Sequence, residues 1–209
     1  YLKEDTLDYS SKNVSISEFV HKDLKHFSNS DNIRSIPSLI DGLKPSQRKV
    51  LYCCIKRKLD KEIRVAQLAG YVSEHGAYHH GEASLQGTII NMAQDFVGSN
   101  NMNLLDPIGQ FGTRIMGGKD SAQPRYIHTK LRTITILMFN KLDNPIYNYN
   151  QDDGENIEPN YYTPVLPLIL INGTSGIGTG WSTDIPNFDP KDILINIRNN
   201  LNGKEYNSM

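Results

Sequence analysis

The sequence predicts an α+β fold that is mainly α. Several segments carry apolar residues at helical spacing, and in residues 84–97 these recur at i, i+4, i+7, i+8 and i+11. Glycine-rich stretches around residues 109–120 and 173–180 cannot continue a helix and indicate loops, a wing or tight turns. The apolar run at residues 165–172 is short and better suits a buried strand. Helices are therefore expected first, with loops and strands after them.

The first expected helix covers residues 16–27 and is followed by a turn at residues 28–31. The second covers residues 45–59, and the proline at its start suits a first helical turn because the N–H that proline lacks would be unpaired there. A shorter helix is expected over residues 65–72, before the clearest one over residues 84–97. This order of helices, with a glycine-rich stretch after them, is the layout of a helix-turn-helix or winged-helix module.

The second half of the chain alternates between irregular and ordered segments. Order returns over residues 123–138, whereas residues 140–160 are rich in Asn and Asp and are expected to form an exposed connector. The strand-like run at residues 165–172 and the glycine-rich turn at residues 173–180 follow. Residues 190–201 are expected to form an amphipathic tail.

Composition excludes several classes of protein. Hydrophobic residues make up 38% and charged residues 22%, which fits neither a disordered nor a membrane-bound chain. No run of 18 apolar residues exists, so no transmembrane helix is expected. The chain begins at Tyr1 without a visible signal peptide. Cys53 and Cys54 are adjacent, lie in an apolar helical pattern and lack a spaced partner, so reduced core thiols are expected.

Charge is unevenly distributed along the chain. The formal net charge of -1 argues against a uniformly basic nucleic-acid binder. Between Lys44 and Arg64, however, eight basic residues and two acidic ones give a local excess of +6. Such a segment fits a phosphate backbone, although a solvated helix face explains it equally well. Residues 78–82 lie just before the helix expected over residues 84–97, and a helix N-terminus favours phosphate.

Three familiar ligand motifs are excluded by their spacing. Residues 172–182 lack the lysine that a P-loop places after its last glycine, and their glycines do not fit the dinucleotide fingerprint. Residues 148–153 loosely resemble a calcium loop, but Asp153 stands where glycine is needed and Pro159 where a bidentate glutamate is needed. Residues 79–82 hold two histidines and a glutamate, yet adjacent histidines cannot share a helical face. No third ligand is suitably spaced, so no metal site is expected.

Tyr126 is the candidate nucleophile, although the chain has eleven tyrosines and most must belong to the core or the surface. Arg125 precedes it, and the Gly-Gly-Lys-Asp sequence at residues 117–120 lies shortly before. A phenol, with a pKa of about 10, attacks poorly at neutral pH unless cations or a metal stabilise its oxyanion and the phosphoryl transition state. Because Arg125 supplies one such cation, attack of Tyr126 on a phosphodiester is a working hypothesis.

Several motifs follow one another in an order that carries a family resemblance. They occupy residues 31–38, 41–52, 78–82, 91–101, 112–114, 117–120, 125–127 and 176–182. Over residues 14–203 the chain resembles the DNA-cleaving core of type II DNA topoisomerases. Its Gly-Lys-Asp and Gly-Trp-Ser sequences are typical of the eukaryotic branch rather than of bacterial gyrase.

The resemblance implies a division into three parts. Residues 1–30 would be an N-terminal connector and helix, and residues 31–164 a winged-helix domain that carries the catalytic tyrosine. Residues 165–209 would begin an α/β tower domain.

The resemblance also implies a role for individual residues. Tyr126 would form a 5′-phosphotyrosine link and release a 3′-hydroxyl, while Arg125 would stabilise the transition state. His80 and Arg48 would contact the same phosphate region. Ile177 would be an apolar wedge between base pairs, and such a wedge offsets the cost of unstacking by gaining contacts with bent DNA.

Further DNA contacts are implied at Lys44, Lys49, His79, Lys119, Ser84 and Gly87. The last two lie at the start of the DNA-facing helix, where cleavage-trapping drugs act in the family.

Cofactors and partners are implied as well. The family's metal-binding carboxylates belong to an upstream Toprim domain and its ATP site to an ATPase domain, so Mg²⁺ and ATP would be bound outside this chain. Double-stranded DNA would be the partner, the full-length enzyme would be a homodimer in the nucleus, and no membrane would be involved. We expect this chain alone to bind DNA but to cleave it poorly or not at all.

A non-catalytic winged-helix module that binds DNA or acts as a scaffold is the main alternative. It shares the basic segment and the helical layout, but it gives no reason for the Arg125–Tyr126 pair or for Ile177 between glycines. Nucleotide binding at the glycine-rich turn is a third hypothesis, and only affinity for ATP would revive it.

Overall fold

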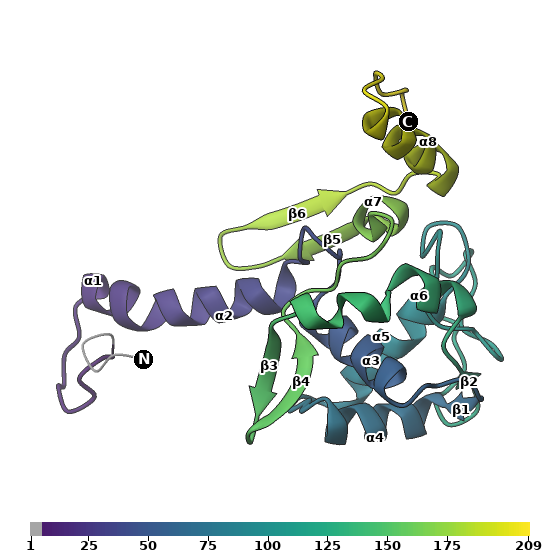
Figure 1. Ribbon diagram of the computed structural model, residues 1–209. Coiled ribbons are helices and arrows are strands. Elements are labelled where there is room, and N and C mark those ends of the chain that lie inside the picture. Colours follow the sequence, from purple (N-terminus) through teal and green to yellow (C-terminus); the bar gives the residue numbers. More distant parts are fainter. Residues whose placement is uncertain (1–5) are drawn as a thin grey trace.

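The computed structural model describes residues 6–209, and it confirms the α+β, mainly α fold class. A long helical arm extends from a compact body of helices, and three hairpin-like strand pairs lie around that body (Figure 1). Within the described residues, no helix is long and apolar enough to cross a membrane.

The arm consists of α1 (Ile16–Phe19), the π-helical turn η2 (Val20–Leu24) and α2 (Lys25–Ser35) (Figure 1). The expected helix is therefore present, but the turn expected at residues 28–31 is wrong because α2 continues to Ser35. The Ser35 hydroxyl lies 3.2 Å from an Asp31 carboxylate oxygen one turn earlier. Neighbouring polar side chains of α2 bind a distant hairpin, so tertiary contacts hold in a helix residues that locally favour a turn.

The body is built on α3 (Pro45–Lys56), α4 (Val65–His75) and α5 (Glu82–Ala93). All three helices were expected, and their buried residues include Leu51, Leu68 and Leu85, each 0% exposed. Full burial of such a side chain stabilises the fold by about 1.5–3 kcal/mol. Helix α5 ends before the expected residue 97 because Gln94 leaves the helical conformation. The Gln94 side chain donates to the Phe111 carbonyl instead.

Short antiparallel strands close the base of the body. Strand β1 (Ile63–Arg64) precedes α4 and pairs with β2 (His128–Thr129). Helix α6 (Thr133–Met138) follows β2. Cys53 and Cys54 on α3 are buried and free, which confirms the expected core thiols.

The exposed connector expected at residues 140–160 is wrong. These residues form the 3-10 helix η3 (Lys141–Ile146) and a hairpin of β3 (Tyr149–Asp152) and β4 (Glu155–Pro159). The turn between the strands has positive φ angles of 47° at Asp153 and 83° at Gly154. An Asp-Gly pair with two positive φ angles is typical of a tight hairpin turn. The hairpin packs against α3, where the Tyr52 hydroxyl donates to the Asn156 carbonyl at 2.9 Å.

The strand expected at residues 165–172 is also wrong, although its burial was correctly predicted. The segment forms the short helix α7 (Leu168–Asn172), with Leu168, Ile169 and Ile171 buried. Apolar runs of this length suit a buried strand or a buried helical turn equally, and Pro167 suits a helix start.

The C-terminal part consists of a second hairpin and a helix. Strands β5 (Thr174–Ile177) and β6 (Ser182–Ile185) pair through four residues, and the glycine-rich turn joins them. Helix α8 (Pro190–Leu201) confirms the expected amphipathic tail, and the Asp189 carboxylate caps it by accepting from the Lys191 N–H at 2.8 Å. The domain boundaries expected near residues 31 and 165 stay predictions.

Candidate nucleic-acid interface

A groove of about 380 Å³ lies where the end of α2, the starts of α3 and α5, and the β5–β6 hairpin meet. The sequence-predicted residues that line it are Lys44, Lys49, His80, Ser84 and Ile177. Two helices begin at this groove, so unpaired N–H groups and positive dipole ends point toward it. The groove is therefore suited to an anionic backbone.

Ile177 projects from the hairpin beside this groove. Its side chain is 84% exposed, at the end of β5, and Trp181 across the turn is 72% exposed. The Gly178 N–H donates to the Trp181 carbonyl at 2.8 Å, which closes the turn. An isoleucine this exposed contributes little to the core, so its place at the tip suits insertion into a partner.

Tyr126 lies on the surface, with its side chain 66% exposed. The Arg125 guanidinium carbon lies 4.8 Å from the centre of its ring, and the tyrosine hydroxyl makes no hydrogen bond to any residue from 6 to 209. Its N–H donates to the Gln123 carbonyl at 2.9 Å in a turn, and Ile127, which follows, is 2% exposed. A buried neighbour and a hydrogen-bonded turn thus fix the backbone, while the phenol and the guanidinium face solvent together.

Tyr126 and His80 lie at opposite ends of α4. Val65 begins α4, and its N–H donates to the carbonyl of Ile127, next to the tyrosine. His80 follows the other end of the helix, toward the β3–β4 hairpin (Figure 1). The 11 residues of α4 span about 16 Å. One copy of the chain therefore separates two residues that were expected at the same phosphate.

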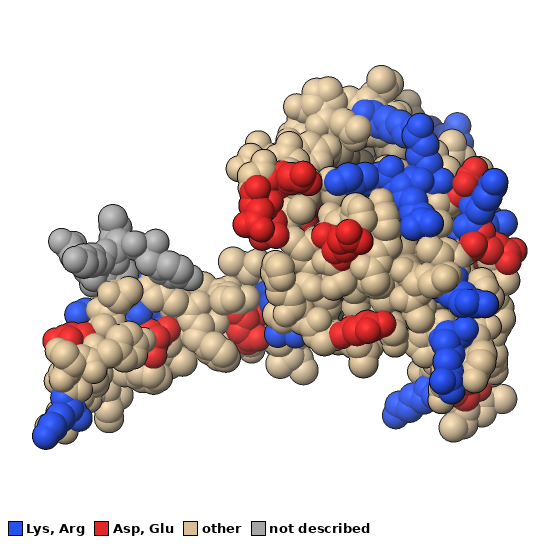
Figure 2. Space-filling model, turned by 90° about the horizontal axis from the view of Figure 1, so that it is seen from below, with Lys and Arg blue, Asp and Glu red and all other residues tan. Residues whose placement is uncertain are grey.

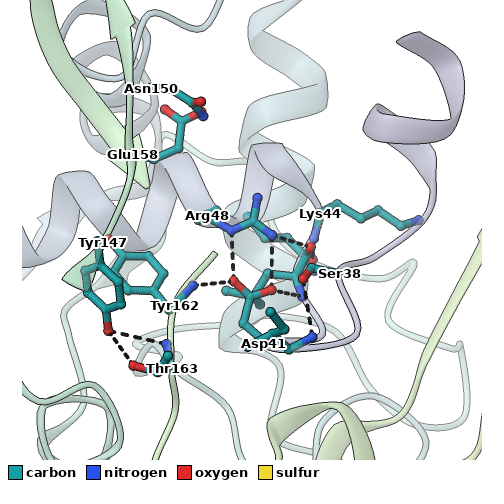
Figure 3. Close-up of polar contacts among 12 residues, drawn as sticks. Ser38, Asp41, Lys44, Arg48, Tyr147, Asn150, Glu158, Tyr162 and Thr163 are labelled. Carbon is teal, nitrogen blue, oxygen red and sulfur yellow. Dashed lines mark hydrogen bonds and ion pairs between the residues drawn. The ribbon is translucent and has the colours of Figure 1, made fainter. Parts of the chain in front are cut away.

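Arg48 does not line the groove, in contrast to its expected phosphate contact. It is 5% exposed and forms an ion pair with Asp41, which is 0% exposed. The Arg48 guanidinium donates to both Asp41 carboxylate oxygens at 2.8 and 3.0 Å and to the Leu43 carbonyl at 2.8 Å (Figure 3). Asp41 also accepts from the N–H of Tyr162 at 2.8 Å. Arg48 thus holds the loop before α3, and so supports the groove from inside.

Lys49 faces the groove only in part, because its ammonium group is bound inside the molecule. It donates to the Gly76 carbonyl at 2.6 Å and to the Glu158 carboxylate at 2.8 Å. Glu158 also accepts from the Asn150 side chain at 3.2 Å, within the same hairpin (Figure 3). The expected DNA contact of Lys49 is therefore corrected to an internal tie between α3 and the β3–β4 hairpin.

The other predicted contacts lie at the surface outside the groove. His79 is exposed and lies 3.7 Å from an Asp152 carboxylate oxygen, while Gly87 lies within α5 with open space around its Cα. Lys119 is exposed in a loop that Asp120 closes by accepting from the Thr113 N–H at 2.7 Å and from its hydroxyl at 2.8 Å. These two bonds, the backbone one first, lower the pKa of the Asp120 carboxyl. The closed loop keeps Lys119 at the surface.

Residues 34–209 match the family model that describes the A-type polypeptide of DNA gyrase and topoisomerase IV. The chain belongs to this topoisomerase family. It is 57% identical over 209 residues to DNA topoisomerase 2 of Candida albicans, covering 100% of this chain and 14% of that protein. It is 56% identical over 205 residues to DNA topoisomerase 2-alpha of Homo sapiens, covering 98% of this chain and 13% of that protein.

A solved structure supports the same family. The topoisomerase II DNA-binding, cleavage and re-ligation domain of Plasmodium falciparum aligns with a TM-score of 0.88 and 55% identity, covering 98% of this chain and 28% of that one. The resemblance to eukaryotic type II topoisomerases is thereby confirmed. The chain spans only 13% to 14% of the length of the Candida and human topoisomerases.

The basic segment of this topoisomerase-family chain does not form one face. Lys44 lines the groove, whereas Arg48 and Lys49 are bound internally. Its remaining basic residues, Lys56, Arg57, Lys58, Lys61 and Arg64, are exposed. Lysine and arginine side chains gather on one side of the lower face, and acidic ones lie elsewhere on it (Figure 2). The local charge excess was correct, but helical geometry divides it between three environments.

Sequence reasoning missed part of the groove. Asp31, Arg34 and Ser35 of α2 line it, together with Ser46 of α3 and Tyr78. Arg34 lies inside a motif that carried the resemblance, but the turn expected at residues 28–31 concealed the helix that brings it there. A helical register continued through Ser35 is the signal that would have placed it on the groove side.

Proposed function

We propose that this chain is the DNA-binding and DNA-cleaving part of an ATP-dependent type II DNA topoisomerase. The observation that carries the proposal is the exposed, unbonded phenol of Tyr126 beside the Arg125 guanidinium, in a chain of this family. The full-length enzyme would break both strands of one duplex, pass another duplex through the break and reseal it.

The proposed chemistry is a transesterification at phosphorus. The phenolic oxygen of Tyr126 forms a bond to a backbone phosphorus and loses its proton, while the bond from phosphorus to the 3′ oxygen breaks and that oxygen gains a proton. The products are a 5′-phosphotyrosine link and a 3′-hydroxyl, so resealing is the reverse reaction. The guanidinium of Arg125 stabilises the charge that builds up on the phosphoryl oxygens.

The groove is proposed to hold the duplex before it is cut. Lys44, His80 and the first turn of α5 would contact the backbone, and Ile177 would enter between base pairs to bend it. Unstacking a base step costs a few kcal/mol, which contacts with bent DNA offset. Phosphate contacts position the duplex without selecting its sequence.

Mg²⁺ and ATP are proposed to bind outside this chain. Within residues 6–209, no group of three or more His, Cys, Asp or Glu side chains could hold a metal ion. We therefore assign Mg²⁺ to a Toprim domain and ATP to an ATPase domain of the full-length protein. This chain would supply the nucleophile and the neighbouring guanidinium.

A homodimer follows from the geometry of one copy. Because α4 separates Tyr126 from His80 by about 16 Å, the two reach one phosphate only if each comes from a different copy. Two copies would then form two such sites, one for each DNA strand. We propose that this dimer acts in the nucleus, where a eukaryotic enzyme of this kind meets its substrate.

Substitution of the nucleophile tests the proposed function. In the full-length enzyme, Tyr126→Phe should abolish the covalent protein–DNA adduct, detected as labelled DNA that remains on the protein after denaturation, while DNA binding persists. Tyr206→Phe is the matched control, because that side chain is 68% exposed and Tyr126 is 66% exposed. If the adduct forms in the Tyr126→Phe enzyme, the assignment is wrong and a non-catalytic DNA-binding module becomes the better description.

A further inference from the structure

The tip of the β5–β6 hairpin is tied to helix α2 by side chains. The Thr179 hydroxyl lies 2.7 Å from an Asp31 carboxylate oxygen and donates to it. The Asn32 side-chain amide donates to the Thr179 carbonyl at 3.3 Å. The Ser35 hydroxyl donates to the other Asp31 oxygen at 3.2 Å, which orients that carboxylate. Residues almost 150 positions apart in the sequence thus fix one residue of the tip.

Two glycines of the same hairpin allow this close approach. A Cβ on Gly176 would lie 2.3 Å from the Ser35 carbonyl oxygen, and one on Gly178 would lie 2.1 Å from Oδ1 of Asn32. That Asn32 oxygen is buried and has no hydrogen-bond partner within the described residues. It faces Gly178 at a distance that only a glycine Cα–H allows, a weak contact that replaces a hydrogen bond. The glycines on either side of Ile177 therefore serve to seat the hairpin on α2.

Nothing else in the described residues grips the tip by side chains. Ile177 and Trp181 are 84% and 72% exposed, and Gly178 is bonded only within the turn. The base of the hairpin is held elsewhere, where Asn172 of α7 donates to the Met102 carbonyl at 2.8 Å. The tip follows α2, whereas the base follows the body.

We propose that Asp31 and Asn32 are positioning residues that fix the angle at which Ile177 enters DNA. The inference rests on the proposed role of Ile177 as a wedge. A wedge between base pairs must resist the restoring force of stacking, which amounts to a few kcal/mol per step. A hairpin free at its tip would swing away instead of bending the duplex, and the ties to α2 prevent this swing.

The first test measures the hairpin without DNA. Trp181 is the chain's single tryptophan, so its fluorescence anisotropy decay reports the motion of the tip. Thr179→Val removes the hydroxyl that binds Asp31 and should add a fast component to the decay. Thr183→Val in β6 is the matched control, because that threonine has a similar exposure and its hydroxyl makes no hydrogen bond within the described residues. Equal decays for both variants and the unaltered chain would overturn the inference.

The second test measures DNA bending by the full-length enzyme. A duplex labelled at both ends reports bending by energy transfer, with DNA affinity measured on the same duplex. Thr179→Val should lower the bent-to-straight ratio about fivefold, the factor expected from one hydrogen bond. DNA affinity should change less than bending does. Thr179→Ser keeps the hydroxyl and should restore bending, which a general loss of stability would not predict.

Ile177→Ala separates failure of the inference from failure of the proposed function. If Ile177→Ala reduces bending but Thr179→Val does not, the wedge stands and the positioning role of Asp31 and Asn32 is overturned. If Ile177→Ala leaves bending unchanged, the wedge itself fails and the inference fails with it. Reduced bending in both variants, with rescue by Thr179→Ser, supports the inference.

Discussion

At the scale of single residues, Lys44 and Lys49 show how the same side chain serves two purposes on neighbouring turns. Lys44 points away from the Asp41–Arg48 cluster (Figure 3) and lines the groove. The ammonium group of Lys49 is held by the buried carboxylate of Glu158 at 2.8 Å. Sequence alone assigned both to DNA, because charge and spacing do not reveal which lysine finds an internal partner.

Alanine substitution should separate these two lysines. Lys44→Ala should weaken DNA binding and lower the slope of log affinity against log salt by about 0.9, the value for one phosphate contact. Its free energy of unfolding should stay unchanged. Lys49→Ala should leave the salt slope unchanged and lower the free energy of unfolding by about 3 kcal/mol, because Glu158 becomes a buried unpaired charge. Salt-dependent binding and denaturant unfolding measure both, and the reverse pattern would contradict the assignment.

The two cysteines predict a dependence of stability on alkaline pH. Burial raises the pKa of the Cys53 thiol from 9.0 to about 12, and burial first, then the neighbouring Cys53, raises that of Cys54 as well. Unfolded thiols lose their protons above pH 9 while native ones keep them, so the native state binds more protons there. Stability should therefore be constant below pH 9 and fall as pH rises toward 12, by up to about 1.4 kcal/mol per pH unit and thiol.

Denaturant unfolding at a series of alkaline pH values measures this decline. A variant with Cys53→Ala and Cys54→Ala should lose that part of the pH dependence, which separates it from the titration of lysines and tyrosines. Rapid alkylation of the native thiols by iodoacetamide at about pH 8 would show that they are not protected as described.

At the scale of elements, two helical glycines offer a matched comparison. A Cβ on Gly70 of α4 or on Gly87 of α5 would meet no atom within 4 Å. Each Gly→Ala change should therefore stabilise its helix by up to about 1 kcal/mol. Only Gly87 belongs to the helix expected to face DNA, so Gly87→Ala should also weaken DNA binding, whereas Gly70→Ala should not. If both variants bind as tightly as the unaltered chain, Gly87 makes no close contact with DNA.

The elements also show what sequence reasoning can recover. Helices α3, α4, α5 and α8 were predicted because each buries an apolar face whose spacing is visible in the sequence. The β3–β4 hairpin was missed because its Asn- and Asp-rich composition suggests a connector. What stabilises it is a contact with α3, between Glu158 and Lys49, that no local pattern contains. The Asp153–Gly154 pair was the one local signal for that hairpin.

Helix α2 was cut short for a related reason. Its final turn contains Ser, Asp and Asn residues that favour turns when nothing else binds them. In the folded chain Asp31 and Asn32 bind Thr179, so the helix continues. Local propensity was outweighed by a contact between residues far apart in the sequence, and such contacts are what one sequence does not report.

At the scale of the whole molecule, the site is divided between two regions of one copy. The groove, with Lys44, His80 and Ile177, lies beyond one end of α4, and the Arg125–Tyr126 pair lies at the other. Sequence motifs identified members of both regions but gave no distance between them. The length of α4, an 11-residue helix, is what makes a second copy necessary.

A mixed dimer of two full-length variants tests this arrangement most directly. One copy carries Tyr126→Phe and the other His80→Ala, and the mixed dimer is purified through different tags. If each site takes its tyrosine from one copy and its groove from the other, the mixed dimer has one complete site and one site lacking both groups. We predict that it nicks supercoiled DNA and stays covalently attached to one strand. A mixed dimer that binds DNA normally but leaves both strands intact would contradict the account.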